Sequence, residues 1–473
     1  MSMKVIRGAK MEEKAKNSVH VLVIPYPSQG HINPMLQFSK RLSSKGLKPT
    51  FATTKFISQT MGPELLLGSD IDFNTISDGC DQGGFLEAND INDYLVRLQA
   101  AGSRSLTELV VKYRNTPHPI DCILYDAFLP WALDVAKQFG LVGAAFFTQA
   151  CAVNYIYYCA HHGVLSLPVS SSAAPIAIPG LPLLELRDMP SFIYVAGSYP
   201  SYFEMVLSQF SNVDQADFIL VNTFYKLEQE VVDSMSKVMT PPLLTIGPTI
   251  PSVYLDQKLE NDKDYDLNLF KLDSTSTHWL TSKTPGSVVY VSFGSMANLS
   301  IDQMEELARG LKKTGFDFLW VVRSSEIAKV PDGFAEEMGD RALIANWISQ
   351  TEVLAHEAVG CFFTHGGWNS TIEALCLGVP MVVMPQWTDQ TTDAKLVQDV
   401  WKVGVRVEVG EDGIVSRDEI EGCIRQVMEA ERGKAMKENA PKWKELSVEA
   451  VCEGGSSDKN IDGFVSKILT QCK

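Results

Sequence analysis

Short apolar runs alternate with amphipathic helical stretches along most of this 473-residue chain, and the alternation restricts the folds open to it. The first half contains runs that we predict as strands: Val19–Ile24, Pro49–Thr53, Asp121–Leu124, Gly143–Phe147, Asp217–Val221 and Leu243–Ile246. Helices are predicted over Pro34–Lys45 and Pro130–Phe139. Such alternation indicates a parallel sheet with helices on both faces.

A second series of the same kind follows a change in composition near Pro248. Residues 251–275 are charged and weakly periodic, which is typical of a linker between domains. Further strands are then predicted over Ser287–Phe293, Phe318–Val322, Leu343–Trp347, Cys361–Thr364 and Met381–Met384. The helices predicted with them are Asp302–Thr314, Ser370–Leu377 and a terminal one over Ser457–Cys472.

We therefore predict an α/β fold class with two tandem Rossmann-like, doubly wound domains that face a central cleft. Residues 1–18 are expected to be a disordered extension, 19–250 the N-terminal domain and 251–275 the linker. Residues 276–456 are expected to form the C-terminal domain, and 457–473 a helix that packs back on the N-terminal domain.

The charge of the chain argues against several kinds of partner. Lys and Arg number 41 against 57 Asp and Glu, a net charge of −16, so we expect no nucleic acid and no anionic membrane surface as a partner. No apolar run has transmembrane length, so no membrane span is expected. The nine cysteines are dispersed, which favours free thiols and a cytoplasmic location. A monomer is the default expectation.

A histidine and an aspartate stand at the ends of two predicted strands. Asn33 and Pro34 resemble an N-cap and a first helical residue, which places His31 just before a helix and after the first strand. The strand run Ile123–Tyr125 ends in Asp126, which would reach the same edge if this strand and the first one are neighbours. An aspartate behind a histidine suits a general base. The alternatives are a histidine in a turn and an aspartate that caps a helix.

The densest polar cluster lies between Trp347 and Gln390. The strand at 361–363 runs into a glycine-containing turn and then a helix, whose free N–H groups make an anion site. His365, Asn369 and Ser370 can add side-chain donors there. Asp389 and Gln390 together suit vicinal sugar hydroxyls.

This stretch resembles the signature block of plant small-molecule UDP-glycosyltransferases, a family with the GT-B fold. The opening PSQGHINP, the VSFGS at 291–295 and the GGSS at 454–457 also resemble that family, so the likeness spans essentially the whole chain. Among its subgroups the chain is most similar to the one that glucosylates steroids, terpenoids and small phenolics or acids. The residues that carry the block are Trp347, Gln350, His365, Gly367, Trp368, Asn369, Ser370, Glu373, Asp389 and Gln390.

The resemblance implies a role for each donor-binding residue. Trp347 would stack on uracil and the backbone of Ile348 would pair with it, while Gln350 and Glu373 would hold the ribose. The diphosphate would be received by Ser295, His365, Asn369 and Ser370, and Gly30 and Gly367 are also expected to bind the donor. Trp368, Asp389 and Gln390 would hold the sugar, and glutamine at the last position usually accompanies UDP-glucose.

The resemblance also implies that His31 is the general base and Asp126 its partner. Acceptor-binding residues are expected in the N-terminal half, at Phe128, Trp131, Phe147, Thr148 and Tyr155. The chain departs from the family pattern at three places: Ile348-Ser349 replaces Ala-Pro, Gly366 replaces Cys, and Thr388 replaces Ala. We expect Gly366 to loosen its turn and Thr388 to adjust the sugar pocket.

The resulting expectation is an inverting O-glycosyltransferase (a hexosyltransferase) that moves glucose from UDP-glucose to a hydroxyl of a steroid or terpenoid. Flavonoid or phenolic hydroxyls and small carboxylates are the alternative acceptors, and a non-catalytic nucleotide-sugar sensor is a remote one. UDP-glucose is a co-substrate, with no tightly bound cofactor and no metal. The acidic run Asp262–Asp266 resembles a DxD metal motif, but we assign it to the solvated linker surface.

An oxidoreductase and a glycoside hydrolase fit the sequence less well. A dinucleotide-binding oxidoreductase needs GxGxxG after the first strand, and the turn from Pro25 to Gly30 lacks it. A glycoside hydrolase needs paired carboxylates that flank the sugar. Glu373 and Asp389 are better placed as groups that bind hydroxyls.

Overall fold

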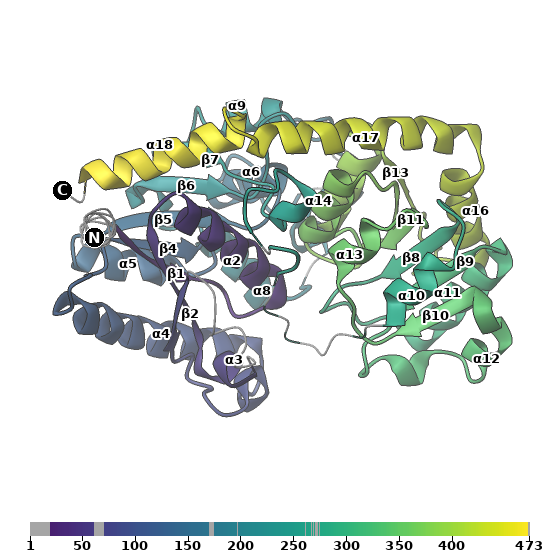
Figure 1. The fold of residues 1–473 in the computed structure, drawn as a ribbon, viewed down its shortest axis with the longest axis horizontal. Coiled ribbons are helices and arrows are strands. Elements are labelled where there is room, and N and C mark those ends of the chain that lie inside the picture. The colour runs from purple at the N-terminus through teal and green to yellow at the C-terminus, as the bar shows by residue number, and fades with distance from the viewer. Residues whose placement is uncertain are drawn as a thin grey trace, which may run out of the picture.

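The computed structural model describes residues 19–60, 71–169, 175–195, 197–260, 262–265, 267, 269, 273 and 275–471, and Figure 1 shows its two sheets side by side. The extension expected over residues 1–18 lies outside the described residues. Both sheets are parallel, and helices cover them, so the predicted α/β fold class is confirmed.

The N-terminal sheet has seven strands in the order β3-β2-β1-β4-β5-β6-β7. Its strands are β1 (His20–Ile24), β2 (Lys48–Thr54), β3 (Asp72–Ile76), β4 (Cys122–Asp126), β5 (Val142–Phe147), β6 (Phe218–Val221) and β7 (Leu243–Thr245). Its helices are α2 (Gln29–Ser44), α3 (Lys55–Thr60), α4 (Ile91–Arg114), α5 (Pro130–Gln138), α6 (Cys151–His161), α7 (Ser191–Tyr194), α8 (Pro200–Ser208) and α9 (Gln229–Met235).

The C-terminal sheet has six strands in the order β10-β9-β8-β11-β12-β13. Its strands are β8 (Val288–Ser292), β9 (Asp317–Val321), β10 (Ala342–Ala345), β11 (Val359–Thr364), β12 (Met381–Val383) and β13 (Gly404–Arg406). The helices that follow the linker are α10 (Thr275–Thr281), α11 (Ile301–Thr314), α12 (Phe334–Met338), α13 (Gln350–Leu354), α14 (Trp368–Leu377), α15 (Gln390–Lys395), α16 (Arg417–Met428), α17 (Glu431–Val451) and α18 (Ser456–Gln471).

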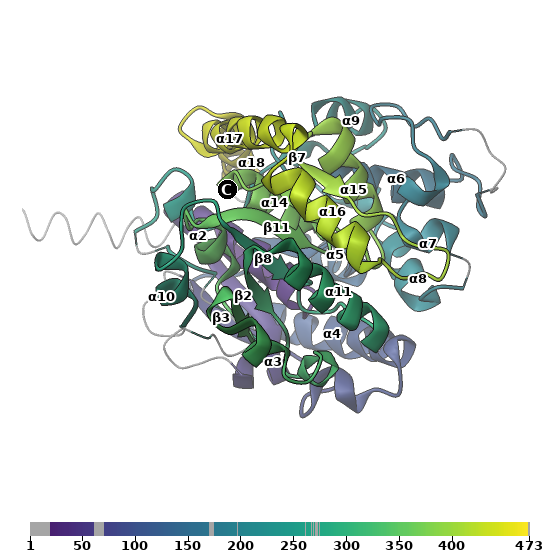
Figure 2. The same cartoon turned by 90° about the vertical axis from the view of Figure 1, so that its right-hand side faces the viewer.

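The strands form where β-branched and aromatic residues are buried on both faces, as the fully buried β1, β4, β8 and β11 show. Helices that cover the sheets begin at polar capping residues, as α11 shows. The Ser300 side chain accepts from the Gln303 N–H at the start of α11, and Gly315, with φ of 76°, ends that helix. α11 packs beside α16 on the outer face of the second sheet (Figure 2).

Each sheet has a point where the strand order reverses. In the first sheet β1 lies between β2 and β4, and Ile24 is in register with Tyr125 at the carboxyl ends. In the second sheet β8 lies between β9 and β11, with Ser292 in register with Thr364. Loops diverge at such points and leave room for a ligand.

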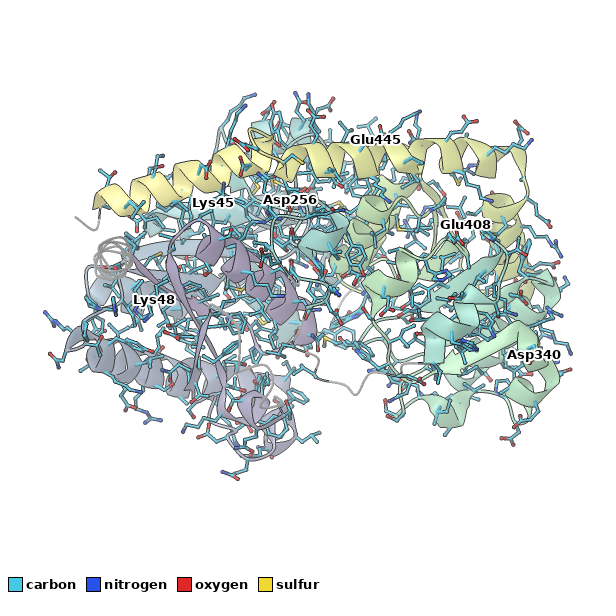
Figure 3. The ribbon with its side chains drawn as sticks, viewed as in Figure 1. Lys45, Lys48, Asp256, Asp340, Glu408 and Glu445 are labelled. Atoms are coloured by element: carbon cyan, nitrogen blue, oxygen red, sulfur yellow. The ribbon has the colours of Figure 1, made fainter. Side chains whose placement is uncertain are left out.

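The last two helices connect the domains along one side of the molecule (Figure 1). α17 packs against α14 and α16 of the C-terminal domain, whereas α18 packs against β7. Phe464 of α18 contacts Phe218 with ring centroids 5.0 Å apart. Lys45, labelled in Figure 3, forms ion pairs with Asp458 and Asp462 of α18 at 2.6 and 2.7 Å. The chain thus returns to its first domain at the end.

The strands β3 and β13 were not predicted. β3 has the sequence DFNTI and lies half-exposed at a sheet edge, and β13 has only three residues. Neither offers the long apolar run from which strands are recognised.

The acidic run of the linker is only partly solvated: Lys263 is exposed, but Asp262 is buried, so the expectation is wrong for Asp262. The Asp262 side chain is 5% exposed and accepts from Lys40 Nζ at 2.6 Å, Gln37 Nε2 at 3.1 Å and the Ser252 N–H at 2.6 Å. Tyr265 is also buried, and Asp266 lies outside the described residues. The run attaches the linker to α2.

Replacing Asp262 with alanine should lower the free energy of unfolding by about 3 kcal/mol, because the Lys40 ammonium and the Ser252 N–H would lose a buried partner. Denaturant titration measures the change. Glu260 is exposed two residues earlier, and Glu260→Ala should change stability by no more than about 0.5 kcal/mol. Equal losses in the two variants would contradict the structural role of Asp262.

Candidate active site

A cavity lies between the two sheets and is lined from both domains at the reversal points of the strand order. Tyr26 and Phe128 line it from the loops after β1 and β4, and His31 lines it from the first turn of α2. Ser295 and His365 line it from the loops after β8 and β11. The two predicted groups of residues therefore share one site.

His31 and Asp126 form a hydrogen-bonded pair on the N-terminal side. His31 Nδ1 lies 2.7 Å from Asp126 Oδ2, and Thr148 Oγ1 lies 3.1 Å from the same nitrogen. The Asp126 side chain is 1% exposed and is fixed by the N–H groups of Tyr26 and Phe128 at 3.3 and 3.0 Å. The rings of Tyr26 and Phe128 also flank the imidazole. This arrangement leaves His31 Nε2 as the nitrogen available to a substrate.

The helix that carries His31 starts earlier than predicted. α2 begins at Gln29 after Ser28, so His31 is in its first turn and Pro34 lies inside the helix. Pro34 has no N–H to offer the Gly30 carbonyl four residues before it. Asn369 of α14 donates to that carbonyl instead, at 2.6 Å. The bond joins the helix of the histidine to the opposite domain.

His365 is packed against two glycines on the C-terminal side. A Cβ on Gly294 would lie 2.8 Å from the imidazole, and one on Gly367 would lie 2.7 Å from it. Burial lowers the pKa of His365 to about 4, so the ring is neutral at pH 7. Gly366 has φ of 77°, and a Cβ there would clash with Val383. Gly366 therefore fits a left-handed turn rather than loosening it, which corrects our expectation.

Glu373 is the centre of a buried hydrogen-bond network. Its two oxygens accept from Gln350 Nε2 at 2.6 Å and from the Tyr265 hydroxyl of the linker at 2.7 Å. Gln350 also donates to Ser370 Oγ and accepts from the Tyr290 hydroxyl. Burial raises the pKa of Glu373 to about 7, although these donors partly oppose the rise. Tyr265 was not predicted as a site residue, because it lies in a stretch without a periodic pattern of apolar residues.

Asp389 and Gln390 lie where the β12 loop meets α15. Gln390 Oε1 accepts from the N–H groups of Gln386 and Trp387, at 2.8 and 3.1 Å, which turns its NH₂ group away from them as a donor. Burial raises the pKa of Asp389 to about 6. The indole N–H of Trp368 donates to the Asn222 carbonyl at 2.7 Å. The indole N–H of Trp368 is therefore not free to donate to a sugar hydroxyl.

The structure brings all predicted donor residues to the cavity. They are Gly30, Ser295, Trp347, Ile348, Gln350, His365, Gly367, Trp368, Asn369, Ser370, Glu373, Asp389 and Gln390.

The predicted acceptor residues divide into two groups. Phe128 and Thr148 line the cavity, whereas Trp131, Phe147 and Tyr155 do not. These three are buried in the core of the N-terminal domain, because they lie on the faces of α5, β5 and α6 that pack on neighbouring elements. We therefore withdraw them as acceptor-binding residues.

Side chains that sequence reasoning missed line the acceptor side instead. Trp387 contacts Phe192 and Tyr202 with ring centroids 5.8 and 5.4 Å apart. Met205 and Val206 of α8 lie beside them. The signal in the sequence was weak, since α7 has only four residues and Trp387 stands in a loop.

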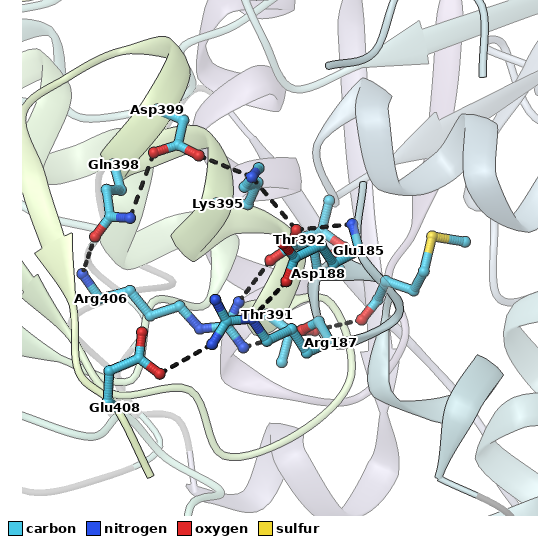
Figure 4. A network of polar contacts seen from close by, with 11 residues as sticks. Glu185, Arg187, Asp188, Thr391, Thr392, Lys395, Gln398, Asp399, Arg406 and Glu408 are labelled. Carbon is cyan, nitrogen blue, oxygen red and sulfur yellow. Dashed lines mark hydrogen bonds and ion pairs between the residues drawn. The ribbon is translucent and has the colours of Figure 1, made fainter. Parts of the chain in front are cut away.

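The segment Glu185–Ser191 is hydrogen-bonded to the loop before α15 and to α15 itself, and Figure 4 shows the part of this network around Asp188. Thr388 has a left-handed backbone with φ of 56°, its N–H donates to Ser191 Oγ at 2.7 Å, and its carbonyl accepts from the Ser191 N–H at 2.8 Å. Thr391 and Thr392 donate to the carbonyls of Met189 and Asp188. The Asp188 carboxylate also pairs with Arg406 and Lys395. This set of contacts is called the clamp below.

Comparisons with known proteins agree with this geometry. A family model described as UDP-glucoronosyl and UDP-glucosyl transferase matches residues 271–448, and one for a glycosyltransferase N-terminal domain matches residues 17–61. UDP-glycosyltransferase 74F2 of Arabidopsis thaliana is 54% identical over 96% of this chain and 99% of its own length. The chain belongs to the UDP-glycosyltransferase family.

Other relatives extend the comparison. The flavonol 7-O-beta-glucosyltransferase UGT74F1 of Arabidopsis thaliana is 53% identical to this glycosyltransferase over 95% of this chain and 98% of its own length. Mogroside I-E synthase of Siraitia grosvenorii is 46% identical over 96% and 99% of the two chains. The crystal structure of Os79 from O. sativa in complex with UDP superposes with a TM-score of 0.90 at 40% identity, covering 95% of this chain and 100% of that one.

The family predicted from the sequence is thus confirmed, and the protein is an enzyme that transfers a sugar from a UDP-sugar to a small-molecule acceptor. Within the described ranges, no cluster of three or more His, Cys, Asp or Glu side chains suits a metal ion. None of the described helices is long and apolar enough to span a membrane.

The raised pKa of Glu373 predicts how donor affinity depends on pH. Ribose hydroxyls donate to a carboxylate, so UDP-glucose should favour the ionised form and bind about tenfold more tightly at pH 8 than at pH 6. Isothermal titration calorimetry measures this for the glycosyltransferase and for Glu373→Gln, which should lose the dependence. Asp389 and His365 are unchanged in both proteins, so equal pH slopes would contradict the role of Glu373.

Asp393 of α15 gives a second pH prediction for the glycosyltransferase. Its side chain is fully buried, neither oxygen meets a hydrogen-bond donor, and the acids Asp389 and Glu228 lie near it. Burial raises its pKa well above the ordinary 3.8, so the folded state binds the extra proton. Stability is therefore lost as pH rises above the pKa of the unfolded chain.

Asp393→Asn should remove this loss, because the amide is neutral and similar in shape. Its free energy of unfolding should exceed that of the parent, and the gap should widen from pH 5 to pH 8. Chemical denaturation at the two pH values measures it. A gap that is constant or narrows with pH would show that Asp393 is ionised in the folded protein.

Proposed function

We propose that the protein is an inverting O-glucosyltransferase that moves glucose from UDP-glucose to a hydroxyl of a hydrophobic, ring-containing metabolite. The observation that carries this proposal is the His31–Asp126 pair, 2.7 Å apart, on the wall of the cavity that also holds the donor residues. A base and a nucleotide-sugar site in one cavity suit transfer better than sensing.

His31 would act as the general base. Asp126 accepts from Nδ1–H, which leaves the lone pair of Nε2 to take the proton of the acceptor hydroxyl. The buried carboxylate then stabilises the imidazolium that forms. The acceptor oxygen bonds to the anomeric carbon as the bond to the UDP oxygen breaks on the opposite side. Because the acceptor oxygen attacks opposite the departing UDP, the configuration at the anomeric carbon is inverted.

The donor would lie along the C-terminal wall. Trp347 and Ile348 would bind uracil, and Gln350 with Glu373 would bind the ribose. Asp389 accepts from sugar hydroxyls, while the Gln390 NH₂ group donates to one, since its oxygen is already bonded to two N–H groups. An amide so oriented is available to a sugar hydroxyl, while the choice of glucose rests on the glutamine at this position of the family block.

The acceptor wall supports an aromatic acceptor as the first candidate. Phe128, Phe192, Tyr202 and Trp387 line this side of the cavity, and aromatic rings stack well on flat ring systems. A relative 53% identical is named as a flavonol glucosyltransferase. We therefore place phenolic and flavonoid hydroxyls first, and the steroid and terpenoid hydroxyls favoured by sequence second.

A mixed panel tests this order. Purified protein is incubated with UDP-glucose and flavonols, simple phenols, small carboxylic acids, steroids and triterpenoids, and products are identified by mass. A hexose gain on flavonols at the highest kcat/KM supports the proposal. A higher kcat/KM on steroids or triterpenoids would replace the acceptor class, and no hexose gain on any acceptor despite donor binding would favour a sensor.

His31→Ala should lower kcat by roughly 10²–10⁴-fold, because no other group would take the acceptor proton. Calorimetry should show unchanged UDP affinity, which separates a lost base from a lost fold. The matched control is His278→Ala, since His278 is exposed on α10 away from the cavity. A His31→Ala protein as active as the parent would show that another group is the base.

A further inference from the structure

The donor site contains an electrostatic imbalance. The described residues that line the cavity include the acids Asp264, Glu373 and Asp389 and contain no lysine or arginine. His365 cannot supply a charge at pH 7, because its pKa is lowered to about 4. Each phosphate of a UDP-sugar is nevertheless anionic. The N-terminus of α14 contributes a partial positive charge, and any full positive charge has to act from behind the described cavity lining.

Arg323 lies directly behind the loop that follows β8. Its guanidinium donates to the Ser295 carbonyl at 2.5 Å and to the Ala297 carbonyl. The same loop contains Gly294, which packs against the His365 ring. A planar guanidinium with two carbonyl partners fixes the course of this loop more tightly than an ammonium would.

Within the described part of the chain Arg323 forms no direct ion pair, although the carboxylate of Glu326 lies near enough for its charge to act on the guanidinium. Glu326, three residues on, is paired with Lys329 at 2.7 Å. Arg323 is half-buried, so solvent screens it less than a surface cation. Its positive charge also contributes to the lowered pKa of His365, so its field reaches the cavity wall.

We propose that Arg323 is the positioning residue for the donor diphosphate, holding the Ser295 loop by two carbonyl bonds and supplying the positive charge that the cavity lining lacks. The inference rests on the proposed UDP-sugar site. It predicts that the contribution of Arg323 to binding affinity increases with the number of phosphates on the ligand, from uridine to UMP to UDP. The same charge stabilises UDP as it leaves, so kcat depends on it as well.

Two variants separate charge from loop geometry. Arg323→Gln removes the charge but keeps an amide donor. Arg323→Lys keeps the charge but loses the planar group whose two nitrogens donate to two carbonyls. The control is Lys329→Met: Lys329 also bonds this loop, at the Leu299 carbonyl at 2.9 Å, but its charge is already paired with Glu326. Affinities of the full-length proteins for uridine, UMP and UDP are measured by calorimetry.

Arg323→Gln should weaken UDP binding by at least about tenfold and leave uridine within about twofold. Arg323→Lys should keep most of the UDP affinity, and Lys329→Met should leave the ratio of UDP to uridine affinity unchanged. An NMR titration of the His365 ring should show a higher pKa in Arg323→Gln than in the parent, which a loss of loop packing alone would not produce.

Three results would overturn the inference: equal losses of uridine and UDP in Arg323→Gln, no loss of either, or a loss in Lys329→Met as large as that in Arg323→Gln. If Arg323→Gln does not fold, Arg323→Lys is the deciding variant, because it keeps the positive charge. A change of about tenfold in the ratio of UDP to uridine affinity in Arg323→Lys would show that the charge is not the cause. A parent protein that binds no UDP would instead refute the donor site itself.

Discussion

The site depends on holding the carboxyl ends of two separate parallel sheets face to face. Neither sheet contains a complete site: the imidazole–carboxylate pair follows β1 and β4, and the anion site follows β8 and β11. The connections that fix their relation include the return of α18 to the first domain, the attachment of the linker through Asp262, and the clamp around Asp188. The chemistry therefore resides in an interface within one chain.

Burial sets the electrical character of that interface. Glu373 and Asp389 are removed from water, which raises the pKa of each, and His365 is kept neutral for the same reason. Side chains so removed from water are poorly stabilised in their charged forms until a ligand provides hydrogen-bond partners. In the donor complex that we propose, sugar and ribose hydroxyls would supply such partners to the carboxylates, and the phosphates would interact with N–H groups and with the charge of Arg323.

The sequence predicted the parts of the site that lie at strand ends or inside the signature block. His31 and Asp126 could be paired because each follows an apolar strand, and parallel strands end at one edge. The start of α2 was misplaced because Asn33-Pro34 has the pattern of a helix start, yet tertiary contact through Asn369 satisfies the carbonyl that Pro34 leaves open. Trp131, Phe147 and Tyr155 are aromatic like pocket residues but pack inward, and no pattern in one sequence tells the two cases apart. Trp387 and Tyr265 belong to loops, whose course is set by partners far along the chain.

The Ser191–Thr388 bridge has a consequence for how this enzyme can diversify. Ser191 begins α7, whose Phe192 lines the cavity, and Thr388 directly precedes Asp389, the residue that we propose binds the sugar. Because two hydrogen bonds tie these backbones together, a shift of one is transmitted to the other. Mutations that reshape the acceptor wall through α7 would thus also move the sugar loop, so acceptor range and donor preference are inherited together rather than tuned one at a time.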